Sequence, residues 1–289
     1  QPESSAASDV YKRQSFMSSK SSKSSKSSKS SRTSKEPEQT IISLEEMAAR
    51  YLDRLQNIYD MVSYTLAGYR KTSESDYDEF AQQLQVMPRQ PARLSYEEVK
   101  PASEQWLLRN TLSDGLAIVM PVLEDARTIC ALCDFKGSGN KDPEQLNEIA
   151  SNQRAEFLQQ VIDKKFEILE ERYGIETEVK VHILSLMEIT KALMMKDGVL
   201  TDEEAEDGKR RLRIRSVQIV QSSEAESSAK PGSLNLTRQV GDMERDIEVG
   251  ETIYFTKAEH IGAILTIGIF VTDVLRGIQA YAQSTGAAD

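Results

Sequence analysis

The stretch Thr256–Val271, TKAEHIGAILTIGIFV, is the most apolar part of the chain and decides its fold. Thr256 and Glu259 form a capping box, in which a hydroxyl and a carboxylate each satisfy a backbone amide at the start of a helix. From Ile261 to Val271 only Thr266 is polar. The sequence therefore predicts a last helix over about 257–283, central and covered on most sides. The 11 residues of the apolar run are too few for a membrane span, which needs about 18.

Upstream, apolar residues recur three or four positions apart, which predicts long helices over most of 41–199. Ser43 and Glu46 form a second capping box, ahead of an apolar stripe that runs to Tyr69. A long helix is predicted over 103–135, kinked at Pro121 because proline removes a backbone donor. Its inward-facing residues are expected to be Trp106, Leu107, Leu112, Leu116, Val119, Leu123, Ile129 and Leu132. A short helix between these two is expected to end before Pro88 and to carry Tyr77, Phe80, Leu84 and Met87.

The next helix is predicted to begin at Asp142-Pro143 and to end at Gly174, where glycine favours the left-handed conformation that stops a helix. One apolar stripe is expected along it: Leu146, Ile149, Phe157, Val161, Phe166, Leu169 and Tyr173. Residues 175–183 alternate as in a strand, whereas 184–195 have helical spacing. We predict a helix from about Val179 to Lys196, because the apolar run there is long for a strand.

The pattern changes to that of a β-sheet in residues 200–256. Two stretches, 209–220 and 246–255, alternate and are rich in β-branched residues, and Gly250 predicts a turn in the second. The Ser-, Glu- and Gly-rich composition of residues 222–240 is typical of a loop. The predicted fold class is mainly α: a helix-bundle-like domain, about 41–285, with a small antiparallel β-hairpin of two or three strands packed near the C-terminal helix.

The N-terminal 40 residues are expected to lie outside this domain. Asp9–Gln14, DVYKRQ, resembles the in-frame translation of a transposon-end adapter used for sequencing libraries, so 1–14 are interpreted as an artefact, with a genuine disordered extension as the alternative. Residues 15–40 repeat Ser-Ser-Lys and hold almost no apolar side chain to bury, which predicts a disordered tail. This tail is either a solvated low-complexity segment or a cationic arm for nucleic acid.

The charge balance separates this tail from the rest. The chain of 289 residues has 36 Lys and Arg, 46 Asp and Glu and a net charge of −10, but residues 1–35 hold eight of the bases and only two of the acids. The remainder therefore carries a net charge of −16 and repels polyanions over most of its surface. Two cysteines exclude a disulfide framework, and no signal peptide is recognised, so we expect a cytoplasmic protein without a membrane anchor.

Motifs that would indicate catalysis are few. Cys130 and Cys133 form a C-x-x-C at the C-terminal end of a predicted helix, the wrong pole for a reactive thiolate, so they are interpreted as buried packing residues. His182 and His260 have no partner histidine at metal spacing and are interpreted as packed and hydrogen-bonded. We expect no catalytic residue, no cofactor and no metal.

One cationic pattern is unusual for so acidic a chain. Lys209, Arg211, Arg213 and Arg215 alternate with apolar residues and share one strand face, where they are candidates for polyanion binding. The competing interpretation is an ion-pair ladder in which Glu244, Asp246 and Glu248 lie opposite the three arginines. We favour the ladder.

Long helices with an inserted hairpin resemble, in layout, the HEPN helical-domain proteins of bacterial conflict systems, many of which are RNases. Their Arg-x(4–6)-His motif is absent, because no arginine lies five to seven residues before His182 or His260. The favoured function is a non-catalytic interaction or scaffold protein that forms a homo-oligomer or binds a protein partner. The alternative is an RNA-directed stress or defence protein that uses the tail or the arginine strand.

Overall fold

The computed structural model describes residues 43–83, 94–137, 143–195, 198–221 and 236–287. All of these residues belong to one compact unit, Ser43–Asp289, whereas the predicted N-terminal artefact and tail lie outside the described residues. The elements, in chain order, are α1 (Leu44–Tyr69), α2 (Glu74–Gln83), α3 (Tyr96–Leu116), α4 (Val119–Gly137), α5 (Pro143–Gln159), α6 (Ile162–Tyr173), α7 (Lys180–Met195), β1 (Lys209–Gln221), β2 (Leu236–Glu248) and α8 (Lys257–Ser284). The mainly α fold with an antiparallel hairpin against the C-terminal helix is confirmed.

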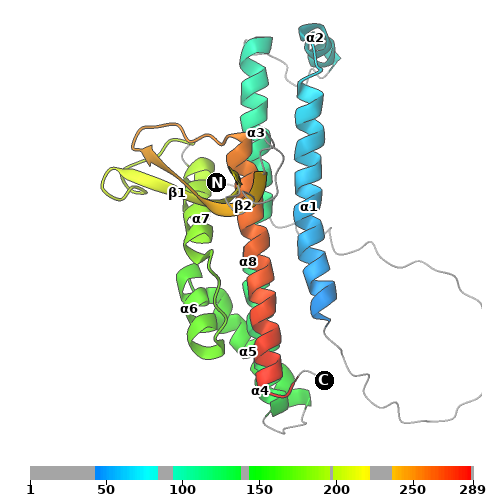
Figure 1. Cartoon of the computed structure of the whole chain (residues 1–289), viewed down its shortest axis with the longest axis vertical. Coiled ribbons are helices and arrows are strands. Elements are labelled where there is room, and N and C mark those ends of the chain that lie inside the picture. The colour runs from blue at the N-terminus through cyan, green and yellow to red at the C-terminus, as the bar shows by residue number, and fades with distance from the viewer. Residues whose placement is uncertain (1–42, 84–93, 138–142, 196–197, 222–235, 288–289) are drawn as a thin grey trace, which may run out of the picture. The chain divides into compact units, whose positions relative to one another are not determined.

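Helix α8 is the central element of the unit. It packs against α1, α3, α4, α7 and β1, and both halves of its capping box, Thr256 and Glu259, are present. Figure 1 shows it running beside α3 and α4, with α1 on one side and α7 on the other. Its buried side chains lie on several faces, because neighbours surround it: Glu259, His260, Ala263, Thr266, Ile267, Phe270, Val271, Val274, Leu275 and Ile278. The prediction of a central core helix is confirmed.

In the described part of the chain, α8 is also the one helix long and apolar enough to cross a membrane. Its most apolar 18-residue window has a mean hydropathy of 1.8, and half of that window is buried inside the protein. The core helices of soluble proteins meet the same criterion of length and composition, so the finding is weak evidence for a membrane span.

The helix predicted over 103–135 is two helices. α3 begins earlier, at a capping box of Ser95 and Glu98, and the chain breaks at Ala117–Ile118 before α4. Pro121 therefore lies in the first turn of α4, where a missing amide hydrogen breaks no helical bond. The orientation of Trp106 is also corrected, since this residue is 62% exposed while the following Leu107 and Leu108 are buried.

The helix predicted over 143–173 is likewise two, α5 and α6. The backbone of Val161 is extended, with φ −64° and ψ 157°, and its side chain is 71% exposed rather than inward. Both α5 and α6 contact α4, yet a straight helix over 143–173 would run about 46 Å against about 28 Å for α4. The break lets both segments pack on the same short neighbour. Gly174, with φ +63°, ends α6 as predicted.

The helix predicted from Val179 to Lys196 is confirmed as α7, and the predicted second strand is displaced. β2 occupies 236–248 rather than 246–255, so part of the predicted 222–240 loop is strand, and the turn at Gly250 follows the strand instead of interrupting it. The 13 residues of β1 pair with 13 of β2 through the backbone, which needs no β-branched side chain at each position. Leu84 and Met87, assigned to the short helix now seen as α2, lie outside the described residues.

Candidate interaction surface

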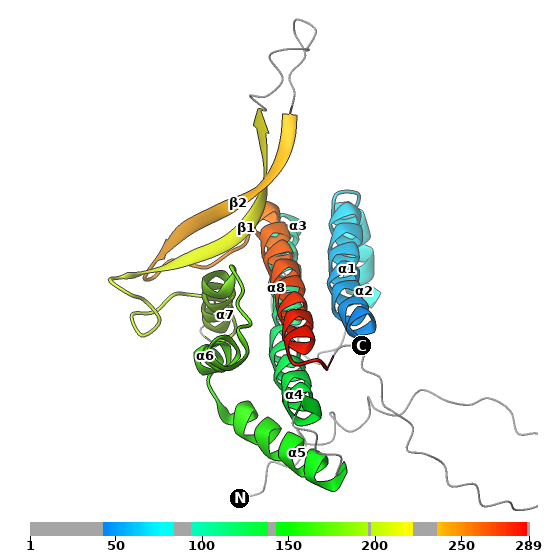
Figure 2. The same ribbon diagram turned by 60° about the horizontal axis from the view of Figure 1, so that its bottom comes forward.

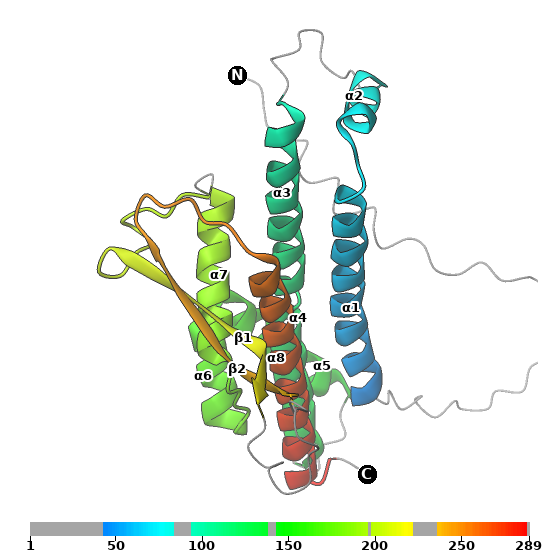
Figure 3. The ribbon, with the colours of Figure 1, turned by 45° about the horizontal axis from the view of Figure 1, so that its top comes forward.

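The β1–β2 ribbon is the element that places the predicted cationic residues. Its antiparallel register sets Lys209, Arg211, Arg213 and Arg215 opposite Glu248, Asp246, Glu244 and Asp242. The ladder interpretation is thus confirmed, with one correction: the third acid opposite an arginine is Asp242, because Glu248 faces Lys209. Figure 3 shows the ribbon crossing α7 and α8, and the opposite face of the ribbon buries Leu212, Ile214 and Ile247.

The helices hold the outer edge of β1. Ser185 of α7 donates to the Arg211 carbonyl at 2.7 Å and accepts from the Arg213 amide at 3.0 Å, while Thr266 of α8 accepts from the Arg215 amide at 2.8 Å. Backbone groups of these three arginines therefore point away from β2, which identifies their pairs with the acids as non-hydrogen-bonded pairs. Side chains lie closest at such pairs, about 4.5 Å between Cα atoms, which favours ion pairing.

The cations of the ladder form ion pairs with the acids opposite or next to them. Arg211 Nε lies 2.6 Å from Asp246 Oδ1, Arg213 Nε lies 3.2 Å from Glu244 Oε1, and Lys209 Nζ lies 2.5 Å from Asp246 Oδ2. Hydrogen bonds from Arg211 and then Lys209 lower the pKa of Asp246 from 3.8 to about 2. The proximal half of the ribbon, Lys209–Arg215 with Asp242–Glu248, thus presents paired charges rather than an unneutralised cationic strip.

The ladder ends at a polar cluster around Asp242. Oδ1 of Asp242 lies 3.1 Å from Arg215 Nη1 and 2.8 Å from His182 Nε2, and Arg215 also pairs with Glu178 at 3.1 Å. His182 is hydrogen-bonded and its side chain is only 12% exposed, as predicted for a packed histidine. The second oxygen, Oδ2, makes no hydrogen bond or ion pair with the described residues, and the Asp242 side chain is 57% exposed.

Beyond Asp242 the same face of the ribbon becomes apolar. The distal face, as we call it, consists of Val217, Ile219, Arg238 and Val240; Val217 pairs with Val240, and Ile219 with Arg238. The three apolar side chains are exposed by 51%, 67% and 46% in chain order. Figure 2 shows this end of the ribbon extending past the helices. This face was not predicted from the sequence, because the loop-like composition of 222–240 hides the start of β2.

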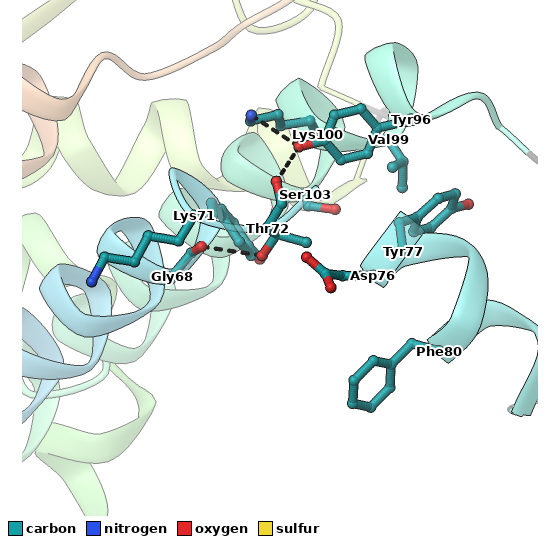
Figure 4. Close-up of a pocket in the computed structure, with 11 residues that line it drawn as sticks. Gly68, Lys71, Thr72, Asp76, Tyr77, Phe80, Tyr96, Val99, Lys100 and Ser103 are labelled. Carbon is teal, nitrogen blue, oxygen red and sulfur yellow. Dashed lines mark hydrogen bonds between the residues drawn. The ribbon is translucent and has the colours of Figure 1, made fainter. Parts of the chain in front are cut away.

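A pocket of about 470 Å³ lies where α1, α2 and α3 meet. The residues that line it include Tyr69, Tyr77, Phe80 and Tyr96 and two lysines, Lys71 and Lys100. Its polar groups mostly bind one another: the Tyr96 hydroxyl donates to the Thr72 carbonyl and accepts from Lys100 Nζ at 3.1 Å. In Figure 4 the Lys71 amine points away from the Tyr77 and Phe80 rings. No nucleophile with an adjacent base is found among these lining residues.

Buried titratable residues elsewhere serve packing. Cys130 and Cys133 are free and buried, as predicted, and burial raises the pKa of Cys130 to about 12. His260 is buried with Nε2 2.9 Å from the Thr111 hydroxyl, and burial lowers its pKa from 6.5 to about 4. Within the described residues, no group of three or more His, Cys, Asp or Glu side chains could hold a metal ion.

Comparison of the chain with family models, with curated proteins and with solved structures finds no match.

Proposed function

We propose that this chain is a non-catalytic interaction protein in which the helices anchor the β1–β2 ribbon as the contact element. One observation carries the proposal: three apolar side chains of the distal face are about half exposed or more, on a strand pair that is fastened to α7 and α8. Apolar side chains gathered on one exposed face mark protein-contact sites, and anchoring lowers the entropy lost on binding.

The anchoring is strong at the proximal end. Arg245 on β2 lies 2.6 Å from the buried carboxylate of Glu259, which also caps α8, and Arg245 donates to the Tyr254 carbonyl at 2.8 Å. These contacts tie the ribbon to the first turn of the central helix. The distal face is therefore presented by a fixed support.

Variants of the distal face test this proposal. Ile219→Asp introduces a charge at a position that is already 67% exposed, so folding should be unaffected while an apolar contact is lost. Met61→Asp, at a position on α1 that is 64% exposed, is the matched control. In affinity purification from an extract of the source cells, we expect proteins that the full chain and Met61→Asp retain to be lost from Ile219→Asp. Equal retention by all three chains would contradict the proposal.

The alternative function, RNA binding, would require four cations to be available to phosphate: Lys209, Arg211, Arg213 and Arg215. Because each of these cations lies beside a carboxylate, we expect the full chain to show no salt-sensitive affinity for RNA through them. RNA binding that falls with salt and disappears in a triple Arg→Gln variant of 211, 213 and 215 would favour polyanion binding instead.

A further inference from the structure

We infer that the β1–β2 ribbon binds a second copy of this chain, edge to edge through the part of β2 that carries the distal face. The paired segment is Arg238–Asp242 of each copy, antiparallel and centred on Val240, so that two ribbons form one four-stranded sheet. This inference rests on the proposed function and names the partner and the register.

The outer edge of β2 carries backbone groups that do not bind β1. The β1–β2 register is continuous, so Arg238, Val240 and Asp242 share the parity of Glu244 and Asp246, whose pairs with β1 are non-hydrogen-bonded. Their amides and carbonyls therefore point outward, away from β1. The described residues supply one contact to this row, from Gln218 Nε2 to the Asp242 carbonyl at 3.2 Å, and a carbonyl has a second lone pair. Such an open edge accepts another strand.

The outer edge of β1 is less open than that of β2. Side chains of Ser185 and Thr266 bind its backbone from Arg211 to Arg215, so an added strand would meet α7 and α8 there. At the proximal end of β2, the amide of Glu248 is used by Glu251. Since only Val217–Gln221 of β1 lies beyond these contacts, the longer accessible edge is the part of β2 between Arg238 and Asp246.

Charge complementarity indicates that a second copy of this chain binds the β2 edge, and it sets the register of the two strands. With Val240 opposite Val240 of the second copy, Arg238 of each copy faces Asp242 of the other. Arg238 forms no ion pair with the described residues, and Asp242 keeps Oδ2 available because its contacts with Arg215 and His182 both use Oδ1. A shift that places Asp242 opposite Asp242 would bring like charges together.

The symmetry of this arrangement is favourable. An antiparallel pair of identical strands has a two-fold axis, the commonest symmetry of homo-oligomers, and it closes as a dimer. The two helical bodies lie at opposite ends of the joint sheet, because β2 runs in opposite directions in the two copies. The apolar side chains Val217, Ile219 and Val240 of both copies then share one face of the sheet.

A charge-swap experiment tests the register. In Arg238→Asp the introduced carboxylate would face Asp242 of the other copy, and in Asp242→Arg the introduced guanidinium would face Arg238. Each variant alone should therefore sediment as a monomer of about 32.4 kDa. In the equimolar mixture both contacts become opposite-charge pairs, and the mass should rise towards twice that value with concentration, as in the unaltered chain. Arg54→Asp, the same charge change on an exposed position of α1, should dimerise like the unaltered chain.

Disulfide trapping provides a measurement that does not depend on Asp242. Val240→Cys should form a cross-linked dimer on oxidation, since Cα atoms of a hydrogen-bonded antiparallel pair lie about 5.5 Å apart, within disulfide range. Val217→Cys is the control: its two copies would be three strand spacings apart, about 14 Å, and should not cross-link. The native Cys130 and Cys133 are buried.

A monomeric unaltered chain at every concentration would overturn this inference, and so would a dimer that survives Arg238→Asp and that Val240→Cys does not cross-link. In either case, loss of other retained proteins from Ile219→Asp would leave the proposed interaction function standing. Retention of the same proteins by Ile219→Asp together with the expected dimer would overturn only the wider function.

Discussion

Gly262 is a residue at which α8 lies very close to β1. A Cβ atom at this position would lie 2.7 Å from the Arg215 carbonyl oxygen and 2.9 Å from Ile214 Cδ1, closer than real Cβ atoms approach. Gly268, six residues along the same helix, has no heavy atom within 4 Å of such a Cβ. The two positions therefore separate the cost of contact from the helix propensity of glycine.

We predict that Gly262→Ala and Gly268→Ala change stability in opposite directions. Overpacking against the β1 backbone should lower the free energy of unfolding of Gly262→Ala by about 1–3 kcal/mol. Gly268→Ala should raise it by up to about 1 kcal/mol, since alanine is the better helix former. Urea unfolding of both variants measures the difference, and a stabilised Gly262→Ala would show that β1 does not lie so close to α8.

His260 makes the stability of the protein depend on pH. Its pKa is about 4 in the folded protein against 6.5 for the free side chain, because burial disfavours the charged ring. Between these values the unfolded chain binds a proton that the folded chain does not, so the free energy of unfolding falls as the pH is lowered from about 6.5 to 4. The slope is at most about 1.4 kcal/mol per pH unit for one group.

We predict that His260→Gln, which keeps a polar side chain beside Thr111 but cannot titrate, loses this component. Unfolding free energies at pH 7.5 and 5.0 should differ less for His260→Gln than for the unaltered chain. The same pH dependence in both proteins would assign the effect to other groups, among them the carboxylates of the ladder.

At the scale of elements, the ladder of the β1–β2 ribbon couples two strands by charge as well as by hydrogen bonds. The Arg213–Glu244 pair is suited to measurement, because both side chains are partly exposed, 36% and 46%, and lie directly opposite each other. A single exposed ion pair contributes little to the free energy of unfolding. The coupling energy between the two side chains therefore has to be separated from the effect of each single substitution.

A double-mutant cycle of Arg213→Gln and Glu244→Gln should give a coupling energy of about 0.2–1 kcal/mol that decreases with added salt. The control cycle pairs Arg213→Gln with Glu248→Gln, whose position faces Lys209 rather than Arg213, and should be additive. Zero coupling in the first cycle would show that the ladder does not stabilise the fold and would favour the cations as a polyanion-binding strip.

At the scale of the whole molecule, α8 joins the helices and the ribbon into one core. Six of its large apolar side chains, Ile267, Phe270, Val271, Val274, Leu275 and Ile278, are buried among other elements. Burial of each contributes about 1.5–3 kcal/mol, so together they match or exceed the whole stability of a domain, about 5–15 kcal/mol.

Removal of 256–289 is therefore predicted to leave a chain that does not fold. We expect the truncated protein to be insoluble, or to show no cooperative thermal transition by circular dichroism. A soluble fragment that melts cooperatively would identify α8 as an appended element, such as an anchor for a membrane or a partner, and would contradict its central role.

Local signals in the sequence were sufficient for much of the fold. The capping box at Thr256, the left-handed stop at Gly174 and the alternation of 209–220 each depend on neighbouring residues only, and each is found as predicted. The ladder was predictable in kind because the apolar residues that alternate with the charges, among them Ile214 and Ile247, are buried on one face and leave the cations and acids together on the other.

Short-range periodicity and capping were therefore enough to predict the fold class, the central helix and the presence of an ion-pair ladder. The breaks at Ala117 and Val161, the start of β2 and the exposure of Val217, Ile219 and Val240 became clear only from the packed structure. All of these features have one cause. Where a helix breaks, how far a strand pairs and which apolar side chains stay uncovered depend on the position and length of elements distant in sequence, here α4, β1, α7 and α8.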